Sequence, residues 1–373
     1  MELIAYGAFF LTTALVFSLI TLGLNVQWGL TGLFNVGIAG FVAIGAYTSA
    51  LLTTPDDPGR FGGLDWPIIA GWLAAMVTAG LVAALTGLAT LRLKADYLAI
   101  TTFGVAVVVQ LVALNAQRLT GGPFGVGFIP RPFAGLAERP LLFNVANLAI
   151  VAMVVAVVFL ALVRLSASPW GRVLKALRED ERAAMSLGKN ARLYRVQAFA
   201  LGGAVMGLAG AVQAHFIGFI APENYLPTLT FQVWVMLIVG GSGSNVGALV
   251  GSLLVWAIWA GSGALVSAVV PTDQQARAAA LQIVAIGVML CVILLVRPTG
   301  LFGGRGAAGA GPRRRAKPKP EGRRHPTAPG VSRASPAARG SPRARRRRWR
   351  PRRRSWRCGY PRAPGRSNGA RRP

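Results

Sequence analysis

Two sets of residues in this chain of 373 could take part in chemistry, and neither has the make-up of a catalytic centre. The first is a charged block, SPWGRVLKALREDERAAMSLGKNARLYRV, which runs from Ser168 to Val196 between two long apolar stretches. Charged side chains on a short connection suit docking to another protein. The second set places amides and glycines inside apolar stretches, where they suit hydrogen bonding between helices or contact with a polar solute: Asn25, Gln27, Asn35, Gly37, Gly240, Gly241, Gly243 and Gly247.

Signatures of the common nucleotide and metal sites are missing from the sequence. No G-x-x-x-x-G-K-[ST], H-E-x-x-H or C-x-x-C motif occurs. The two cysteines, Cys291 and Cys358, have no metal-ligand spacing and suggest no disulfide. His215 stands near the end of an apolar stretch, where a lone histidine is more often a satisfied polar contact than a ligand. We therefore predict no catalytic residue, no metal ligand and no cofactor.

The composition is that of a membrane protein. Hydrophobic residues make up 53% of the chain and charged residues only 14%. A transmembrane helix needs about 20 mostly apolar residues. Candidates lie near residues 3–24, 28–52, 66–91, 97–115, 141–163, 196–219, 229–240, 247–270 and 281–296, the seventh being short enough for a broken or re-entrant piece. The expected fold is an all-α integral membrane protein, a polytopic bundle of eight to nine transmembrane helices, with nine favoured.

Basic residues near the ends of the spans predict the orientation, because cytoplasmic connections are rich in Lys and Arg. The connection 164–195 holds eight of them and should be cytoplasmic. Alternating outward, Arg92 and Lys94 fall inside, and the acidic segment around Asp56 and Asp65 falls outside. A multi-pass protein of the bacterial cytoplasmic membrane is expected, with its C-terminus in the cytoplasm.

The chain divides by composition into a transmembrane domain, 1–303, and a tail, 304–373. The tail contains 24 of the 40 Lys and Arg and one of the 12 acids, so the net charge of +28 belongs mostly to it. Rich in Arg and Pro and without periodicity, it should be disordered. It could tether the chain to anionic membrane lipid. It could equally be a dispensable extension, since GC-rich codons in the wrong frame give this composition. Nucleic-acid binding is not expected, because no folded reader accompanies the arginines.

Two apolar stretches carry small residues at every fourth position. Such faces let helix backbones approach closely in lipid. We expect them to pack helices within one subunit: Gly71, Ala75, Ala79, Ala83 and Gly87 in one stretch, and Gly203, Gly207 and Ala211 in the other.

The charged block itself predicts two short helices. Ser168 can cap the first and Pro169 can take its first position. This helix should have an apolar side, with Lys175 and Arg178 opposite. Asp180 can start the second helix, and Gly188 can end it. The second helix should carry Ala183, Ala184 and Leu187 on one side. The residues alone leave open whether this is a docking helix or a solvated loop, and slightly favour the loop.

Resemblance to a known family favours docking. REDERAAMSLGKN resembles the cytoplasmic EAA loop of ABC importer permeases, and SPWGRVLKALREDERAA is similar to the permease subunits of branched-chain amino-acid ABC transporters, Liv type and M-like. Further stretches agree with that family in consistent order over about residues 20–303: LNVQWGLTGLFNVGIAGFVAIGAYTSALL, LRLKADYLAITTFG, LTGGPFGV, GLAGAVQAHFIGFIAPENY, LIVGGSGSNVGALVGSLL and RPTGLFG. The chain departs from the family pattern at Ile38, Val107 and Gln110, so its internal polar contacts should differ.

The resemblance implies a machine with separate parts. This subunit would pair with a second, H-like permease, two cytoplasmic ATP-binding subunits would hydrolyse ATP, and an extracytoplasmic solute-binding protein would deliver branched-chain or related amino acids. The permease would then be no enzyme. Its coupling loop would span about residues 164–195, and the residues implied to transmit ATPase closure are Glu181, Ala183, Ala184 and Gly188, together with Arg178 and Asp180.

Two alternatives stay open from the sequence. The amides and glycines of the second set either bond helices together or line the translocation pathway, and the glycines from Gly240 to Gly247 would permit a broken helix. The alternative function is a self-contained secondary carrier or channel for a small polar solute such as urea or an amide.

Overall fold

The computed structural model describes residues 2–56, 61–90, 95–136 and 138–269, together with positions 271, 280, 281, 284, 287, 288, 292, 295 and 300–302. These residues form helices and one isolated antiparallel bridge, Val126–Ile220. The elements are α1 (Glu2–Leu24), η1 (Asn25–Leu30), α2 (Ile38–Thr53), α3 (Ile68–Thr90), α4 (Ala95–Asn115), α5 (Gln117–Thr120), η2 (Gly122–Phe124), η3 (Ala134–Leu136), α6 (Pro140–Ala167), α7 (Pro169–Glu179), α8 (Glu181–Ser186), α9 (Ala191–Ile217), η4 (Pro222–Tyr225), α10 (Pro227–Gly240) and α11 (Asn245–Val269).

Six of the described helices are long and apolar enough to cross a membrane: Ile4–Leu30, Ile68–Thr90, Asp96–Asn115, Pro140–Ala167, Ala191–Ile217 and Asn245–Ala264. Two shorter apolar helices, Ile38–Thr53 and Pro227–Gly240, accompany them. An all-helical membrane protein is thereby confirmed, and the short seventh span exists as α10. The predicted ninth span, 281–296, lies largely outside the described residues, and Arg92, Lys94 and the tail 304–373 lie wholly outside them. The count of eight to nine spans stays a prediction.

The predicted boundary between the first two spans is wrong. The first helix continues past Leu24 as the π-helical turn η1, and the second begins only at Ile38 rather than near residue 28. Gly32, at φ +72°, turns the chain out of the helix. The non-helical backbone from there to Gly37 is tolerated within this apolar stretch because its groups find partners. The amide of Val36, for example, donates to Thr102 Oγ1 at 3.0 Å.

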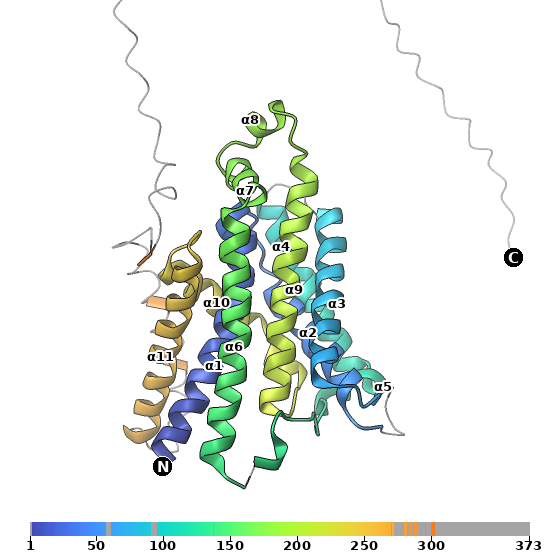
Figure 1. Ribbon diagram of the computed structural model, residues 1–373, viewed down its shortest axis with the longest axis vertical. Helices are drawn as coiled ribbons and strands as arrows, with labels where there is room; N and C mark the ends of the chain where they lie inside the picture. The colour runs from blue at the N-terminus through green and yellow to red at the C-terminus, as the bar shows by residue number, and fades with distance from the viewer. Residues whose placement is uncertain are drawn as a thin grey trace, which may run out of the picture. The chain divides into compact units, whose positions relative to one another are not determined.

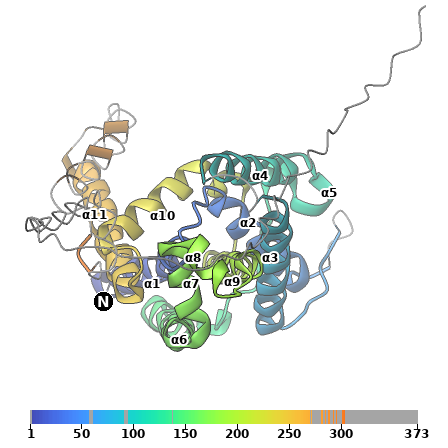
Figure 2. The same ribbon diagram turned by 90° about the horizontal axis from the view of Figure 1, so that it is seen from above.

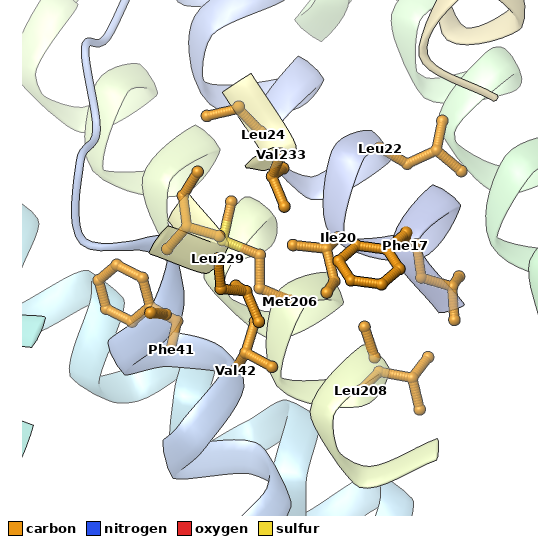
Figure 3. Close-up of a cluster of buried hydrophobic side chains, with 14 of the residues drawn as sticks. Phe17, Ile20, Leu22, Leu24, Phe41, Val42, Met206, Leu208, Leu229 and Val233 are labelled. Atoms are coloured by element: carbon orange, nitrogen blue, oxygen red, sulfur yellow. The ribbon is translucent and has the colours of Figure 1, made fainter. Parts of the chain in front are cut away.

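The bundle has a buried centre and a more exposed periphery, and the short helix α2 belongs to the centre because most of its residues are buried. The window that marks the first span is 67% buried and that of α9 is 72% buried, whereas the corresponding windows of α3, α4, α6 and α11 are 17–28% buried. Viewed from the end that carries α7 and α8, α9 lies between α3 and α6, with α1 beside it (Figure 2). The side chains that fill the interior come from α1, α2, α9 and α10, and include Phe17, Ile20, Phe41, Met206 and Val233 (Figure 3).

The predicted packing of the small-residue faces within the subunit is confirmed, and the structure shows that the two faces meet each other. A methyl group built on Gly203 would collide with the side chain of Ala83, and one on Gly207 with that of Ala79. Gly45 of α2 packs directly against the backbone of Gly207, because a Cβ on Gly45 would collide with the Gly207 carbonyl oxygen. Helix α9 therefore lies in close contact with α2 and α3, which fixes the position of its first turns, where the charged block ends.

Candidate functional site

The charged block folds as two capped helices, α7 and α8, at the opposite end of the bundle from the N-terminus (Figure 1). Ser168 Oγ accepts from the amide of Gly171, and Pro169 is the first residue of α7. Asp180 Oδ1 accepts from the amide of Ala183 at 3.0 Å and so caps α8. Both predicted helix starts are confirmed.

Gly188 ends α8 through its backbone conformation. Its φ is +76°. Its amide donates to the carbonyl of Met185 at 2.9 Å, and the next amide, of Lys189, donates to the carbonyl of Ala184 at 3.3 Å. This pair of bonds is a Schellman motif, which needs a left-handed residue at the position after the cap. The predicted glycine stop is confirmed.

The faces of α8 differ from the prediction. Ala184 is buried (5% exposed) in a small cluster with Leu177 and Ala191. Ala183 is exposed, as is Leu187, which is 79% exposed. The sequence had placed these three on one side of the helix. A helix of six residues is too short for its period to be read reliably, because one residue of offset rotates the face by 100°.

One ion pair joins the start of α8 to the first turns of α9. Arg195 Nη1 lies 2.9 Å from Glu181 Oε1, with the two side chains 21% and 39% exposed. A pair this open to solvent contributes about 1 kcal/mol or less. The ion pair matters more for holding α8 against α9 than for stability. It borders a cleft between these helices that is lined by Glu181, Met185, Lys189, Asn190, Ala191, Arg192 and Arg195.

Arg178 points into the bundle, not away from it as the predicted polar face implied. Its Nη1 donates to the carbonyl of Gly29 in η1. Burial lowers the pKa of this guanidinium and Glu179 opposes the shift. Arginine nevertheless stays charged at neutral pH. The charged block is thereby bonded to the C-terminal end of the first span.

Asn25 extends that junction to a third element. Its Oδ1 accepts from the amide of Gly243 at 2.8 Å, and its Nδ2 donates to Asn245 Oδ1 at 2.8 Å. Gly243 lies in the turn between α10 and α11, and a Cβ there would lie 3.2 Å from Arg178 Nη1. We call these residues, Asn25, Gly29, Arg178, Gly243 and Asn245, the α7 junction.

The glycines from Gly240 to Gly247 build a tight helical hairpin. Gly241 and Gly243 have φ of +105° and +92° in its turn. A Cβ on Gly240 would collide with the carbonyl of Gly247, so the two helices touch through these positions. The predicted interruption of the helix is present, between the end of α10 and the start of α11.

Gln27, Asn35 and Gly37 form a second buried network. Asn35 Nδ2 donates to Gln27 Oε1 at 2.7 Å, Gln27 Nε2 donates to the carbonyl of Phe199 at 2.9 Å, and the amide of Gly37 donates to Asn35 Oδ1 at 2.7 Å. The amide side chains of Asn25, Gln27 and Asn35 are fully buried. In this conformation they bond helices together, and their contact with a solute stays a prediction.

Several residues of these networks were not singled out from the sequence. Thr102 accepts from the amide of Val36, in the segment before α2, and Thr230 from that of Ala39, in α2. Arg195 pairs with Glu181. Among the residues that were not singled out, only Asn245 could have been noticed from the local sequence, because a polar residue directly before an apolar run often marks the start of a helix. His215 bonds Ser49 and the carbonyl of Pro130, which confirms it as a satisfied polar contact. The described residues contain no group of three His, Cys, Asp or Glu able to hold a metal.

Comparison with known proteins decides the family. The profile described as "Branched-chain amino acid transport system / permease component" matches residues 7–294. The chain belongs to this permease family. It is 36% identical to the LivM high-affinity branched-chain amino acid permease protein of Escherichia coli, over 65% of this chain and 60% of that protein. It is 26% identical to the LivH permease protein of the same organism, over 77% of this chain and 91% of that protein.

Among permeases of this family, the chain is similar to the M-like kind predicted from its sequence. It spans about 60% of the length of the LivM protein of Escherichia coli. The guanosine ABC transporter permease protein NupQ of Bacillus subtilis is 29% identical over 59% of this chain and 70% of that relative. No solved structure matches the chain. Its relatives are transport components and not enzymes, and the helices described above make it a multi-pass membrane protein.

Proposed function

We propose that this permease is one of two membrane subunits of an ATP-driven importer of branched-chain amino acids. The observation that best supports the proposal is the bond from Arg178 of α7 to the carbonyl of Gly29, because it links a capped, protruding helix to the end of a membrane span. ATP hydrolysis belongs, in this proposal, to two separate cytoplasmic subunits. A second, H-like permease completes the pathway, and an extracytoplasmic binding protein delivers the solute.

The docking element is α8. It exposes Ala183, Met185 (47% exposed) and Leu187 (79% exposed) beside the basic residues Arg182 and Lys189. Full burial of a Met or Leu side chain contributes roughly 1.5–3 kcal/mol. A small apolar surface with a positive rim suits a cleft in a soluble partner, and the partner we propose is the ATP-binding subunit. Glu181, Asp180 and Gly188 hold the helix in shape through the ion pair and the two caps.

The α7 junction transmits the movement. Leu174 and Leu177 fix α7 to the bundle through buried contacts. Arg178 then connects α7 to η1, and Asn25 connects η1 to the turn before α11. A hydrogen bond from a charged group is worth about 1.5–3 kcal/mol. Displacement of α8 would thus reach the first span and the α10–α11 hairpin together.

The buried amides would serve the pathway when the junction opens. The buried amides lie where regular α-helical hydrogen bonding is interrupted. The π-helical turn η1 contains Asn25 and Gln27, and the non-helical segment after it contains Asn35 and Gly37. Gly240, Gly241, Gly243 and Gly247 form the hairpin beside them. Interrupted helices supply the polar groups that line solute sites in other transporters. We propose that these residues exchange their present partners for water or solute in the inward-open or outward-open state.

Leucine, isoleucine and valine are the proposed solutes. The support is the identity to LivM, which exceeds that to the guanosine permease NupQ over comparable shares of the chain. The resemblance to named ABC permease proteins also favours a subunit over a self-contained carrier or channel. The location we propose is the bacterial cytoplasmic membrane, with the basic connection 164–195 and the C-terminus on the cytoplasmic side.

Uptake by the reconstituted assembly tests the proposal. The change Glu181→Arg with Gly188→Glu alters charge at both ends of α8 and should lower uptake of labelled leucine at least tenfold, with loss of the ATP-binding subunits on purification. The matched control, Glu138→Arg with Gly135→Glu, makes the same charge change on an exposed loop away from α8 and should keep those subunits bound. Undiminished uptake by the first variant, or leucine uptake by this chain alone in liposomes, contradicts the proposal.

A further inference from the structure

The outer helices differ in what they expose. On α3 every large exposed side chain is apolar, and the same holds for α6 between Leu142 and Val163. The exposed residues of α3 include Leu73, Val77, Leu81 and Leu85, which recur along one side of the helix. Continuous apolar rows of this length suit contact with lipid.

A different surface lies on α4 and α10, which follow one another along one edge of the bundle (Figure 2) and touch at few positions. We call it the α4–α10 face and define it by Phe103, Gln110, Thr228, Phe231 and Gln232. Gln110 and Gln232 are partly exposed, and in the part of the chain that the structure describes neither side chain makes a hydrogen bond. Thr228 is exposed one turn before Gln232 on the same side of α10.

Both glutamines lie within apolar helices, Gln110 in the candidate span Asp96–Asn115 and Gln232 in the shorter helix Pro227–Gly240. Ala106, one turn before Gln110, packs against Gly40, where a Cβ would lie 2.9 Å from the Ala106 Cα. Thr230, two residues before Gln232, accepts from the amide of Ala39 at 3.2 Å. Ala39 and Gly40 begin α2, whose outer end at Thr53 is then about 20 Å away. An amide without partners facing hydrocarbon at that depth is strongly unfavourable.

We infer that the α4–α10 face meets the second permease subunit, with a water-filled solute path between the two. The inference rests on the proposed function, and it assigns a surface that the coupling argument does not use. Water and a facing subunit supply the partners that the glutamines lack. The aromatic side chains beside them, Phe103 at 36% and Phe231 at 58% exposure, are of the kind enriched at protein interfaces.

Cysteine accessibility in the assembled complex tests the inference. In a chain with Cys291→Ser and Cys358→Ser, single variants Gln110→Cys and Gln232→Cys are compared with Leu81→Cys and Val157→Cys on the lipid-facing rows. A charged, water-soluble methanethiosulfonate reagent should react at least tenfold faster at the two glutamine positions. A short bifunctional thiol reagent should join position 232 to a cysteine on the second permease. Equal, slow reaction at all four positions overturns the inference, as does cross-linking of positions 81 or 157 instead.

Gln110→Leu with Gln232→Leu gives a second measure with opposite expectations. On a lipid-facing surface the change would leave uptake intact. On a water-lined interface it should lower leucine uptake at least tenfold, with the ATP-binding subunits still bound. The proposed function and the inferred interface can be refuted separately. Absence of uptake by the unaltered complex counts against the proposed function, whereas full uptake by the double variant counts against the α4–α10 face alone.

Discussion

Replacement of Gly188 by alanine tests the docking helix through a single backbone angle. Nothing lies within 4 Å of a Cβ at this position, so added volume is not the difficulty. The difficulty is φ of +76°, which costs an alanine about 1–2 kcal/mol. Asparagine tolerates this conformation far better and serves as the matched variant. Since α8 has six residues and is too short to be stable alone, the cost should appear in full as unwinding.

The expected effect is large enough to measure. A change of 1–2 kcal/mol shifts the equilibrium between formed and unwound α8 by about 5–30-fold. The Kd of the ATP-binding subunit for the permease in lipid nanodiscs should therefore rise by up to that factor for Gly188→Ala and by about threefold or less for Gly188→Asn. Equal affinity for alanine and wild type would refute the reasoning, and so would an asparagine variant as weak as the alanine one.

Three further predictions concern other parts of the chain. Arg178→Met removes the charged donor to Gly29, a hydrogen bond worth about 1.5–3 kcal/mol, and should lower the leucine moved per ATP hydrolysed; an unchanged ratio contradicts the role of the α7 junction. Gly207→Val should destabilise the purified protein by about 1–3 kcal/mol, because α9 must move away from Ala79 to make room. The destabilisation should be measured as a lower Tm. Gly104→Val, where a Cβ meets nothing within 4 Å, should leave the Tm unchanged, and equal shifts for both variants would disprove the packing argument. Truncation after Gly304 should leave uptake intact, and its loss would show that the basic tail is needed.

Features carried by local sequence could be predicted. The repeat of small residues on α3 and α9 implies close packing whatever the partner, and the structure pairs these two faces with each other. The caps at Ser168, Asp180 and Gly188 follow from residue types that favour one backbone conformation each. These signals are short in range, so a single sequence contains them completely.

Features that depend on distant residues could not be predicted. The apolar run 28–52 conceals the end of the first span, because the non-helical segment before Ile38 is stabilised by Thr102 of α4 and the start of α2 by Thr230 of α10. Arg178 was expected on the polar side of α7, yet its long side chain reaches a backbone carbonyl in η1 that only the folded bundle places there. The sequence likewise could not show that the side chains of Gln110 and Gln232 are partly exposed and make no hydrogen bond within the described residues.

The central claim is that α8 is held by a separate ATP-binding subunit in the cytoplasm, and cross-linking measures this most directly. Met185→Cys, in the chain with Cys291→Ser and Cys358→Ser, places a thiol on the exposed side of α8. With a cysteine series along the surface cleft of the ATP-binding subunit, we predict rapid disulfide formation at one or two adjacent positions and inhibition of uptake that a reductant reverses. No cross-link at any position in a complex that still transports leucine would contradict the account.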